Sequence, residues 1–304
     1  MKTEPTMHEI TLRLDERNLA HVLTALALSG IADEMDGASP DARCWWTDDA
    51  FKLLIPHDQT ALFAKAHTFV KSIRWVAGIG CNEKNNGKLA LEASAHHGLF
   101  VAESGHSGNP LLSYHDQGVT SSIFKTFSGQ QSPATPLGRQ QAALNEPTKV
   151  GDWLFQRATD VGSRWNLDAR VTSHAYDQGF GSDQDQSGKR DPFYPAIELL
   201  SIAGAAFFAA SHAWLIHAEK LTYCIWPQAI SLSLAPLAAT MVPPPPQRRT
   251  SAKTKKPSVL APASLLDGLG CRHYQLATRG NAYGKGAAYR HFPEASLITQ
   301  INNQ

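Results

Sequence analysis

The chain has 304 residues, of which 42% are hydrophobic, so it can bury a sizeable core as one large domain or two small ones. Its net charge of +1 hides an asymmetry: residues 220–304 carry ten Lys/Arg against two acids (+8), while residues 1–219 carry eighteen against twenty-five (−7). The basic part favours a polyanionic partner, and four widely spaced cysteines without a CxxC pair exclude a zinc ribbon and a disulfide framework and favour free thiols in a reducing cytoplasm.

The N-terminal part predicts five elements from hydrophobic periodicity. They follow the order strand–helix–strand–strand–helix, at residues 8–14, 19–35, 44–46, 51–55 and 59–75. Asp15 or Asn18 can cap the first helix, and Asp36-Gly37 ends it. This order fits a ferredoxin-like arrangement loosely. Residues 1–9 lack an apolar run, so we expect no signal peptide.

The middle of the chain is less regular. Periodicity predicts strands at residues 88–95 and 99–102, and helices at residues 139–144 and 150–161. Residues 103–136, rich in Ser, Gly, Gln, Pro and Thr, predict a long loop, which in a compact protein is usually functional or disordered. The apolar stretch 195–218 contains Glu198, which a membrane span tolerates poorly. We therefore predict a buried, alanine-rich core helix there, and no membrane association.

The C-terminal part predicts strands at residues 220–226 and 229–234, then a four-proline spacer at 243–246. We expect three regions: an acidic α+β body at 1–242, a Pro-rich and basic flexible arm at 243–258, and a basic, aromatic-rich segment at 259–304 that packs on the body. The fold class is α+β, with mixed sheet pieces and two or three core helices, and its topology stays open.

Motifs for catalysis are missing. The chain has no GxSxG elbow, no GxxxxGK[ST] loop and no GxGxxG after a strand. His96, His97, His106 and His115 lie close in sequence but lack metal-ligand spacing. Asp168 and Asp177 are not followed by a nuclease-like carboxylate–Lys pair. We therefore expect no enzyme activity, no cofactor and no metal. A metal-dependent nuclease or hydrolase that uses the histidine-rich loop stays open as an alternative.

Three segments are candidates for contact with nucleic acid. In residues 271–292, bases alternate with aromatic rings, a pattern typical of phosphate contacts and base stacking. An ordinary sheet edge with aromatic residues in the core is the alternative there. The loop at 123–139 pairs positive charge with amides that can recognise adenine, although it could equally be a structural loop packed by its phenylalanines. The arm at 247–257 has five bases and no acid. The candidate residues are Lys125, Gln130, Gln131, Arg139, Arg248, Arg249, Lys253, Lys255, Lys256, Arg272, Arg279, Lys285 and Arg290.

Several blocks of the sequence together resemble a family of small, large-subunit-like proteins from type I-G (formerly I-U) CRISPR–Cas loci. The opening ITLRLDERNLAHVLTALALSGIADEMDG, the motif FKTFSGQQSP, the stretch NLDARVTSHAYDQGF, the helix YPAIELLSIAGAAFF and the segment LTYCIWPQAISLSLA follow the order of that family over about residues 9–240. The chain departs where the family has Gln-Arg-Phe-Arg-Pro, because residues 204–209 read GAAFFA and supply no arginine.

The resemblance implies a non-catalytic, large-subunit-like component of a Cascade-type, crRNA-guided surveillance complex active in antiviral defence. Such a subunit would contact target double-stranded DNA, read its PAM and help to open it, while the guide RNA reads the target sequence. Partners would be the crRNA, the backbone and crRNA-end-binding subunits, and a helicase-nuclease. The alternative within the same complex is a scaffold that binds neighbouring subunits or crRNA only, which the acidic body would suit.

Overall fold

A computed structural model describes residues 6–37, 39–77, 98–102, 111–112, 134–147, 153–158, 168, 194–205, 220–240, 269–277 and 296–297. Helices and antiparallel strands pack around one hydrophobic core, which confirms the α+β class. The predicted domain boundaries at 242 and 258 and the arm between them lie outside the described residues. Within those residues, no helix combines the length and apolarity needed to cross a membrane.

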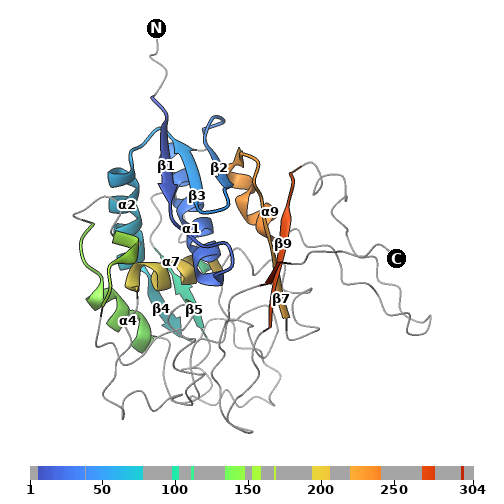
Figure 1. Ribbon diagram of the computed structural model, residues 1–304. Coiled ribbons are helices and arrows are strands. Elements are labelled where there is room, and N and C mark those ends of the chain that lie inside the picture. The colour runs from blue at the N-terminus through green and yellow to red at the C-terminus, as the bar shows by residue number, and fades with distance from the viewer. Residues whose placement is uncertain are drawn as a thin grey trace, which may run out of the picture.

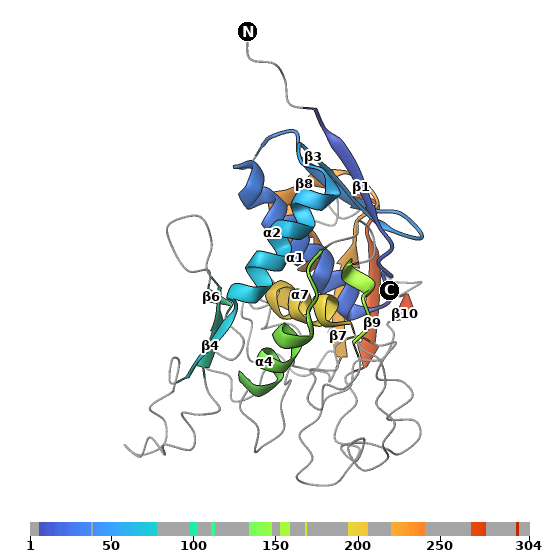
Figure 2. The same cartoon turned by 90° about the vertical axis from the view of Figure 1, so that its left-hand side faces the viewer.

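The N-terminal elements build the central sheet. In chain order they are β1 (His8–Leu12), α1 (Leu19–Asp36), β2 (Arg43–Trp46), β3 (Phe51–Ile55) and α2 (Gln59–Ser72). β3 lies between β1 and β2 and is antiparallel to both, the split β-α-β arrangement found in ferredoxin-like folds. α1 and α2 lie on one side of β1 and β3 (Figure 2).

The sheet then departs from a ferredoxin-like fold. The strand after α2, β4 (Arg74–Ala77), pairs with β5 (Gly98–Val101) in a separate sheet, and β5 also pairs with β6 (Leu111–Leu112). The fourth strand of the central sheet is β8 (Ile230–Ser231), which pairs with the far edge of β2. The final order is β1-β3-β2-β8, so the sheet joins strands from residues 8–55 with a strand at residues 230–231.

Helix α1 begins and ends as its sequence predicts. The Asn18 side chain accepts a hydrogen bond from the Ala20 N–H at 3.1 Å and caps the N-terminus. Gly37 ends the helix at φ 62°, a left-handed conformation that glycine adopts without steric cost. The helix is buried on every side from Leu19 to Ser29, which is more than the one-sided apolar pattern predicts. The reason is that the sheet covers one side and a second helix covers the other.

That second helix is α7 (Pro195–Ala205), whose eleven residues are all buried, as the alanine-rich sequence predicts. It approaches α1 very closely: a Cβ built on Gly204 would lie 1.9 Å from the Leu23 carbonyl oxygen. Ser201 Oγ donates to the Ala20 carbonyl at 2.8 Å, and Thr24 Oγ1 donates to the Ile197 carbonyl at 3.3 Å. Small and hydroxyl side chains therefore allow the two helices to pack almost backbone to backbone. The predicted continuation of the helix to residue 218 lies outside the described residues.

A third sheet stands beside the first, at the right of Figure 1. It consists of β7 (Lys220–Ile225), β9 (Arg272–Ala277) and β10 (Ser296–Leu297), with β9 in the middle. Trp226, directly after β7, connects it to the central sheet: its indole N–H donates to the Cys44 carbonyl at 3.2 Å. The core is thus continuous from one sheet to the other.

Four predicted boundaries or types were wrong. The helix predicted at 59–75 ends at Ser72, because Ile73, Trp75 and Val76 favour strand. Of the helix predicted at 150–161, the structure describes residues 153–158, which contain only one 3-10 turn, Trp153–Phe155. The turn is fixed by the buried Trp153, whose indole N–H donates to the Asn145 carbonyl at 3.0 Å.

The strand predicted at 229–234 is only β8, followed by a 3-10 turn (Leu232–Leu234) and α9 (Ala235–Thr240), which begins with proline in the favoured first turn. The loop predicted at 103–136 contains β6 and the start of α4 (Ala134–Ala143). The strand predicted at 88–95 lies outside the described residues.

Candidate nucleic-acid interface

The central sheet has two chemically different faces. Ile10, Leu12, Phe51, Leu53, Ile55, Cys44 and Trp46 point to the core and are buried. The alternate positions point the other way and form what we call the outer face: Glu9, Thr11, Arg43, Trp45, Lys52, Leu54 and Ser231. None of the described helices covers that face (Figure 2). Among the described elements, it is therefore a sheet surface that no helix occupies.

Strand register arranges the outer face in two rows. In one row, Lys52 stands between Thr11 and Trp45. In the other, Leu54 stands between Glu9 and Arg43, and Ser231 extends that row on the far side of Arg43. Directly opposed residues have Cβ atoms about 5 Å apart. The two cations and the tryptophan therefore lie within reach of one another.

The cations of this face are free to bind an external anion in place of their present partners. Lys52 Nζ lies 2.7 Å from Glu9 Oε1 and 6.0 Å from the centre of the Trp45 ring. The Lys52 and Glu9 side chains are 26% and 50% exposed, and an ion pair in contact with water contributes little, so another anion can replace the carboxylate. Arg43 donates to the carbonyls of Pro40 and Ala42 and carries no carboxylate partner among the described residues. The charged side chains of the outer face, Glu9, Arg43 and Lys52, sum to a net charge of +1, and exposed Arg13 and Asp49 flank the face just beyond its strands.

Most of the predicted nucleic-acid residues lie outside the described part of the chain. This group comprises Lys125, Gln130, Gln131, Arg248, Arg249, Lys253, Lys255, Lys256, Arg279, Lys285 and Arg290. Only Arg139 and Arg272 are placed. The histidines of the predicted loop, His96, His97, His106 and His115, are likewise outside it.

Arg139 is exposed on α4. That helix is fixed to the end of α2 by Gln141, whose side-chain N–H groups donate to the carbonyls of Val70 and Ile73, both at 2.8 Å. Lys71 Nζ donates to the Gln141 carbonyl at 2.5 Å. Arg139 is thus an exposed cation on a well-anchored helix, as a phosphate contact would require, although it does not belong to the outer face.

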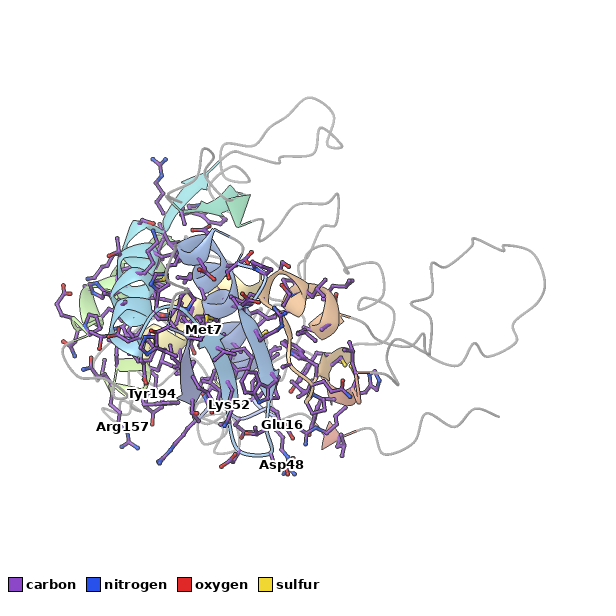
Figure 3. The ribbon with its side chains drawn as sticks, turned by 90° about the horizontal axis from the view of Figure 1, so that it is seen from above. Met7, Glu16, Asp48, Lys52, Arg157 and Tyr194 are labelled. Carbon is purple, nitrogen blue, oxygen red and sulfur yellow. The ribbon has the colours of Figure 1, made fainter. Side chains whose placement is uncertain are left out.

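Arg272 has a different role. Its guanidinium donates to Glu16 Oε2 at 2.6 Å and to Asp48 Oδ1 at 2.8 Å. Glu16 lies between β1 and α1 and Asp48 between β2 and β3, so this bridge, which we call the Arg272 bridge, ties β9 to the central sheet (Figure 3 labels both carboxylates). The three charges sum to −1, so the group as a whole repels phosphate. This weighs against Arg272 as a phosphate ligand.

The aromatic residues around Arg272 are also used inside the protein. Tyr274 is 2% exposed, stacks on Tyr223 with ring centres 5.8 Å apart, and donates to Glu16 Oε1. Burial, followed by the bond to Glu16, raises the pKa of Tyr274 to about 12. His273 is buried as well. For the described residues of the 271–292 segment, the alternative interpretation therefore fits better: the aromatic rings pack in the core and are not available to stack on bases.

A buried polar network holds residue 168 in place. Asp168 Oδ1 accepts from the Asn18 side-chain N–H at 2.7 Å, and the Asp168 backbone N–H donates to Glu198 Oε1 at 3.3 Å. Asn18 and Asp168 are fully buried and Glu198 is 1% exposed. A nuclease carboxylate must reach substrate and metal, which these groups cannot do. The network instead connects the start of α1 with α7.

Groups of three or more His, Cys, Asp or Glu side chains able to hold a metal ion do not occur among the described residues. Searches of protein-family models, of curated proteins and of solved structures found nothing that matches this chain. The interface is therefore argued from its own geometry.

Sequence reasoning missed Arg13, Arg43, Trp45 and Lys52. The signal was present, because the strands at 44–46 and 51–55 were predicted and their alternation separates inward from outward residues. What the sequence could not supply was the pairing register, which brings Lys52 opposite Trp45.

Proposed function

We propose that this chain is a non-catalytic subunit of a Cascade-type, crRNA-guided surveillance complex and that it contacts nucleic acid through the outer face. The observation that carries the nucleic-acid part is the net-positive sheet face, which no described helix covers and which presents Lys52, Arg43 and a half-buried Trp45. Arginine and lysine on such a face can neutralise phosphates. Membership of the complex rests on the resemblance of the sequence blocks.

The test measures how binding depends on salt. The full-length protein is titrated with a fluorescein-labelled single-stranded oligonucleotide of mixed sequence at several salt concentrations. Replacing Arg43 and Lys52 together by alanine removes two phosphate contacts, so we expect the log–log salt slope to fall by roughly 1 to 1.5. Arg74→Ala, which removes an exposed cation from β4 in another sheet, is the matched control. An unchanged slope in the double variant contradicts the proposal.

Reading of the PAM by Gln130 and Gln131, and tracking of phosphate by Arg248, Arg249, Lys253, Lys255 and Lys256, belong to the same proposal. Each is tested in the assembled complex with a target duplex. Lys125→Ala with Gln130→Ala should reduce PAM discrimination, whereas neutralising the arm should lower the salt slope and leave discrimination intact. Equal effects on both readouts would show that these roles are not divided in this way.

A scaffold role in the same complex is the second candidate, and one observation favours it. Leu234, at the end of the 3-10 turn, and Leu237, in α9, are 49% and 54% exposed. Neighbouring exposed leucines are typical of contacts with other proteins. Replacing both by serine should then abolish co-purification with neighbouring subunits and leave oligonucleotide binding unchanged. If the subunits still co-purify, this surface is not the scaffold contact.

A further inference from the structure

Trp45 occupies an unusual place in the central sheet. Its neighbour Trp46 is 1% exposed and packs in the core against Phe51, with ring centres 5.0 Å apart. Trp45 points the opposite way and is only half-buried. β2 is an inner strand, between β3 and β8, so Trp45 does not lie at the edge of the sheet. The fold thus holds a flat ring on the outer face, beside Lys52 of β3, while β8 pairs with β2 only at Arg43 and Cys44.

Two cations lie close to that ring. Lys52 is directly opposite Trp45, and Arg43 lies two residues away on the same strand, about 7 Å along it. Glu9 is the one acid on the face. Its ion pair with Lys52 is in contact with water, so another anion can take its place beside Lys52. An aromatic ring with positive charges at this spacing suits a ligand that combines flat rings with phosphates. Nucleic acid is that ligand.

The shape of the face selects one form of nucleic acid. The bases of a duplex are stacked on each other and present only their edges in the grooves. Stacking on the Trp45 ring needs the π-face of a base, which a paired and stacked duplex does not expose. Unpaired bases offer that face, which is why open sheets with aromatic residues bind single strands.

We propose that the outer face binds a single strand of nucleic acid, with one base stacked on Trp45 and the flanking phosphates held by Arg43 and Lys52. This inference rests on the proposed function, because it specifies the ligand of the same face. In a guided complex, the strand could be the RNA itself or the DNA strand displaced by it. Both share the chemistry named here.

The experiment compares three variants of the full-length protein. Labelled single-stranded RNA, single-stranded DNA and duplex DNA are titrated against the wild type, Trp45→Leu and Trp45→Phe. Trp45→Leu keeps apolar bulk but removes the ring, so single-strand affinity should fall about tenfold. Trp45→Phe keeps a ring and should lose less than about threefold. Trp75→Leu, a half-buried tryptophan of β4, is the matched control and should bind as the wild type does.

The outcomes separate this inference from the proposed function. If Trp45→Leu binds normally but the Arg43/Lys52 double variant loses salt dependence, nucleic acid binds and the stacking is wrong. If duplex DNA binds as tightly as single strands and depends equally on Trp45, the inference is overturned. If no variant alters binding to any oligonucleotide, both proposals fail. Tighter binding of RNA or of DNA identifies which strand occupies the face, and either result supports the inference when it depends on Trp45.

Discussion

The central sheet and the β7–β9 sheet contain similar residues but use them in opposite ways. In the β7–β9 sheet, Arg272 and Tyr274 turn toward the body, where Glu16 binds both. In the central sheet, Arg43, Trp45 and Lys52 point away from the core. A basic and aromatic composition therefore does not identify a binding surface. What decides is whether the fold supplies a buried carboxylate to neutralise the cation and a core to cover the ring.

The largest effect we expect concerns the support behind the central sheet. Replacing Gly204 by alanine would place a methyl group 1.9 Å from the Leu23 carbonyl oxygen and force α7 away from α1. We expect the free energy of unfolding to fall by about 3 kcal/mol, measured by urea denaturation. If the sheets are independent of this helix pair, binding of oligonucleotide should survive; loss of binding would show that the outer face needs rigid support.

Gly138→Ala is the matched control for that variant. Gly138 also lies in a helix, α4, but a Cβ there would meet nothing within 4 Å. Alanine has the higher helix propensity, so stability should stay unchanged or rise by up to about 1 kcal/mol. A loss similar to that of Gly204→Ala would show that close helix approach is not the cause.

An intermediate effect is expected from two arginines, one in each sheet. Arg272→Met leaves Glu16, whose side chain is 12% exposed, without its cation and should lower the free energy of unfolding by about 2 kcal/mol. Arg43→Met removes hydrogen bonds to two backbone carbonyls and no ion pair among the described residues, and should cost less than about 1 kcal/mol. Oligonucleotide affinity should show the reverse order. If Arg272→Met has the larger effect on both stability and affinity, the two arginines do not have the different roles proposed for the two sheets.

The smallest effect concerns pH. Burial lowers the pKa of His273, on β9, below the ordinary histidine value of 6.5. The unfolded chain then binds a proton more readily than the folded one, so stability is complete above pH 6.5 and decreases as the pH falls from 6.5 toward the lower folded pKa. His273→Gln should reduce this loss in urea unfolding measured on both sides of pH 6.5.

His67, on α2, allows a second test of that pH effect, because burial lowers its pKa below 6.5 as well. His67→Gln should remove a further part of the loss of stability below pH 6.5, beyond the part removed by His273→Gln. If His273→Gln leaves the pH dependence of the wild type unchanged, the assignment to His273 is wrong.

The sequence predicted most of the local structure. The cap at Asn18, the left-handed end at Gly37 and the burial of the helix at Pro195 follow from side-chain chemistry within a few residues. Arg272 and Trp45 were harder because their roles depend on distant partners. Glu16 lies 256 residues from Arg272. No local pattern shows that this carboxylate neutralises the arginine.

The contact between α1 and α7 illustrates the same limit. Gly204 and Ser201 interrupt an apolar stretch, and the sequence suggests only that they make it unsuitable for a membrane. Their packing role becomes visible when the Leu23 and Ala20 carbonyls lie beside them. The two residues that interrupt the apolar sequence of α7 are thus the ones that lie against the backbone of α1.

β8 and Trp226 are synthesised long after β2, the strand that they contact, and this affects folding on the ribosome. β2 pairs with β8, and Trp226 reaches the Cys44 carbonyl from 182 residues further along the chain. At typical translation rates of 5–20 residues per second, roughly 10–40 s separate the emergence of these partners from the ribosome. Throughout that interval the nascent sheet has an unpaired edge at β2, and for most of it α1 lacks its covering helix α7. Such a chain would benefit from chaperones or from early capture by a partner.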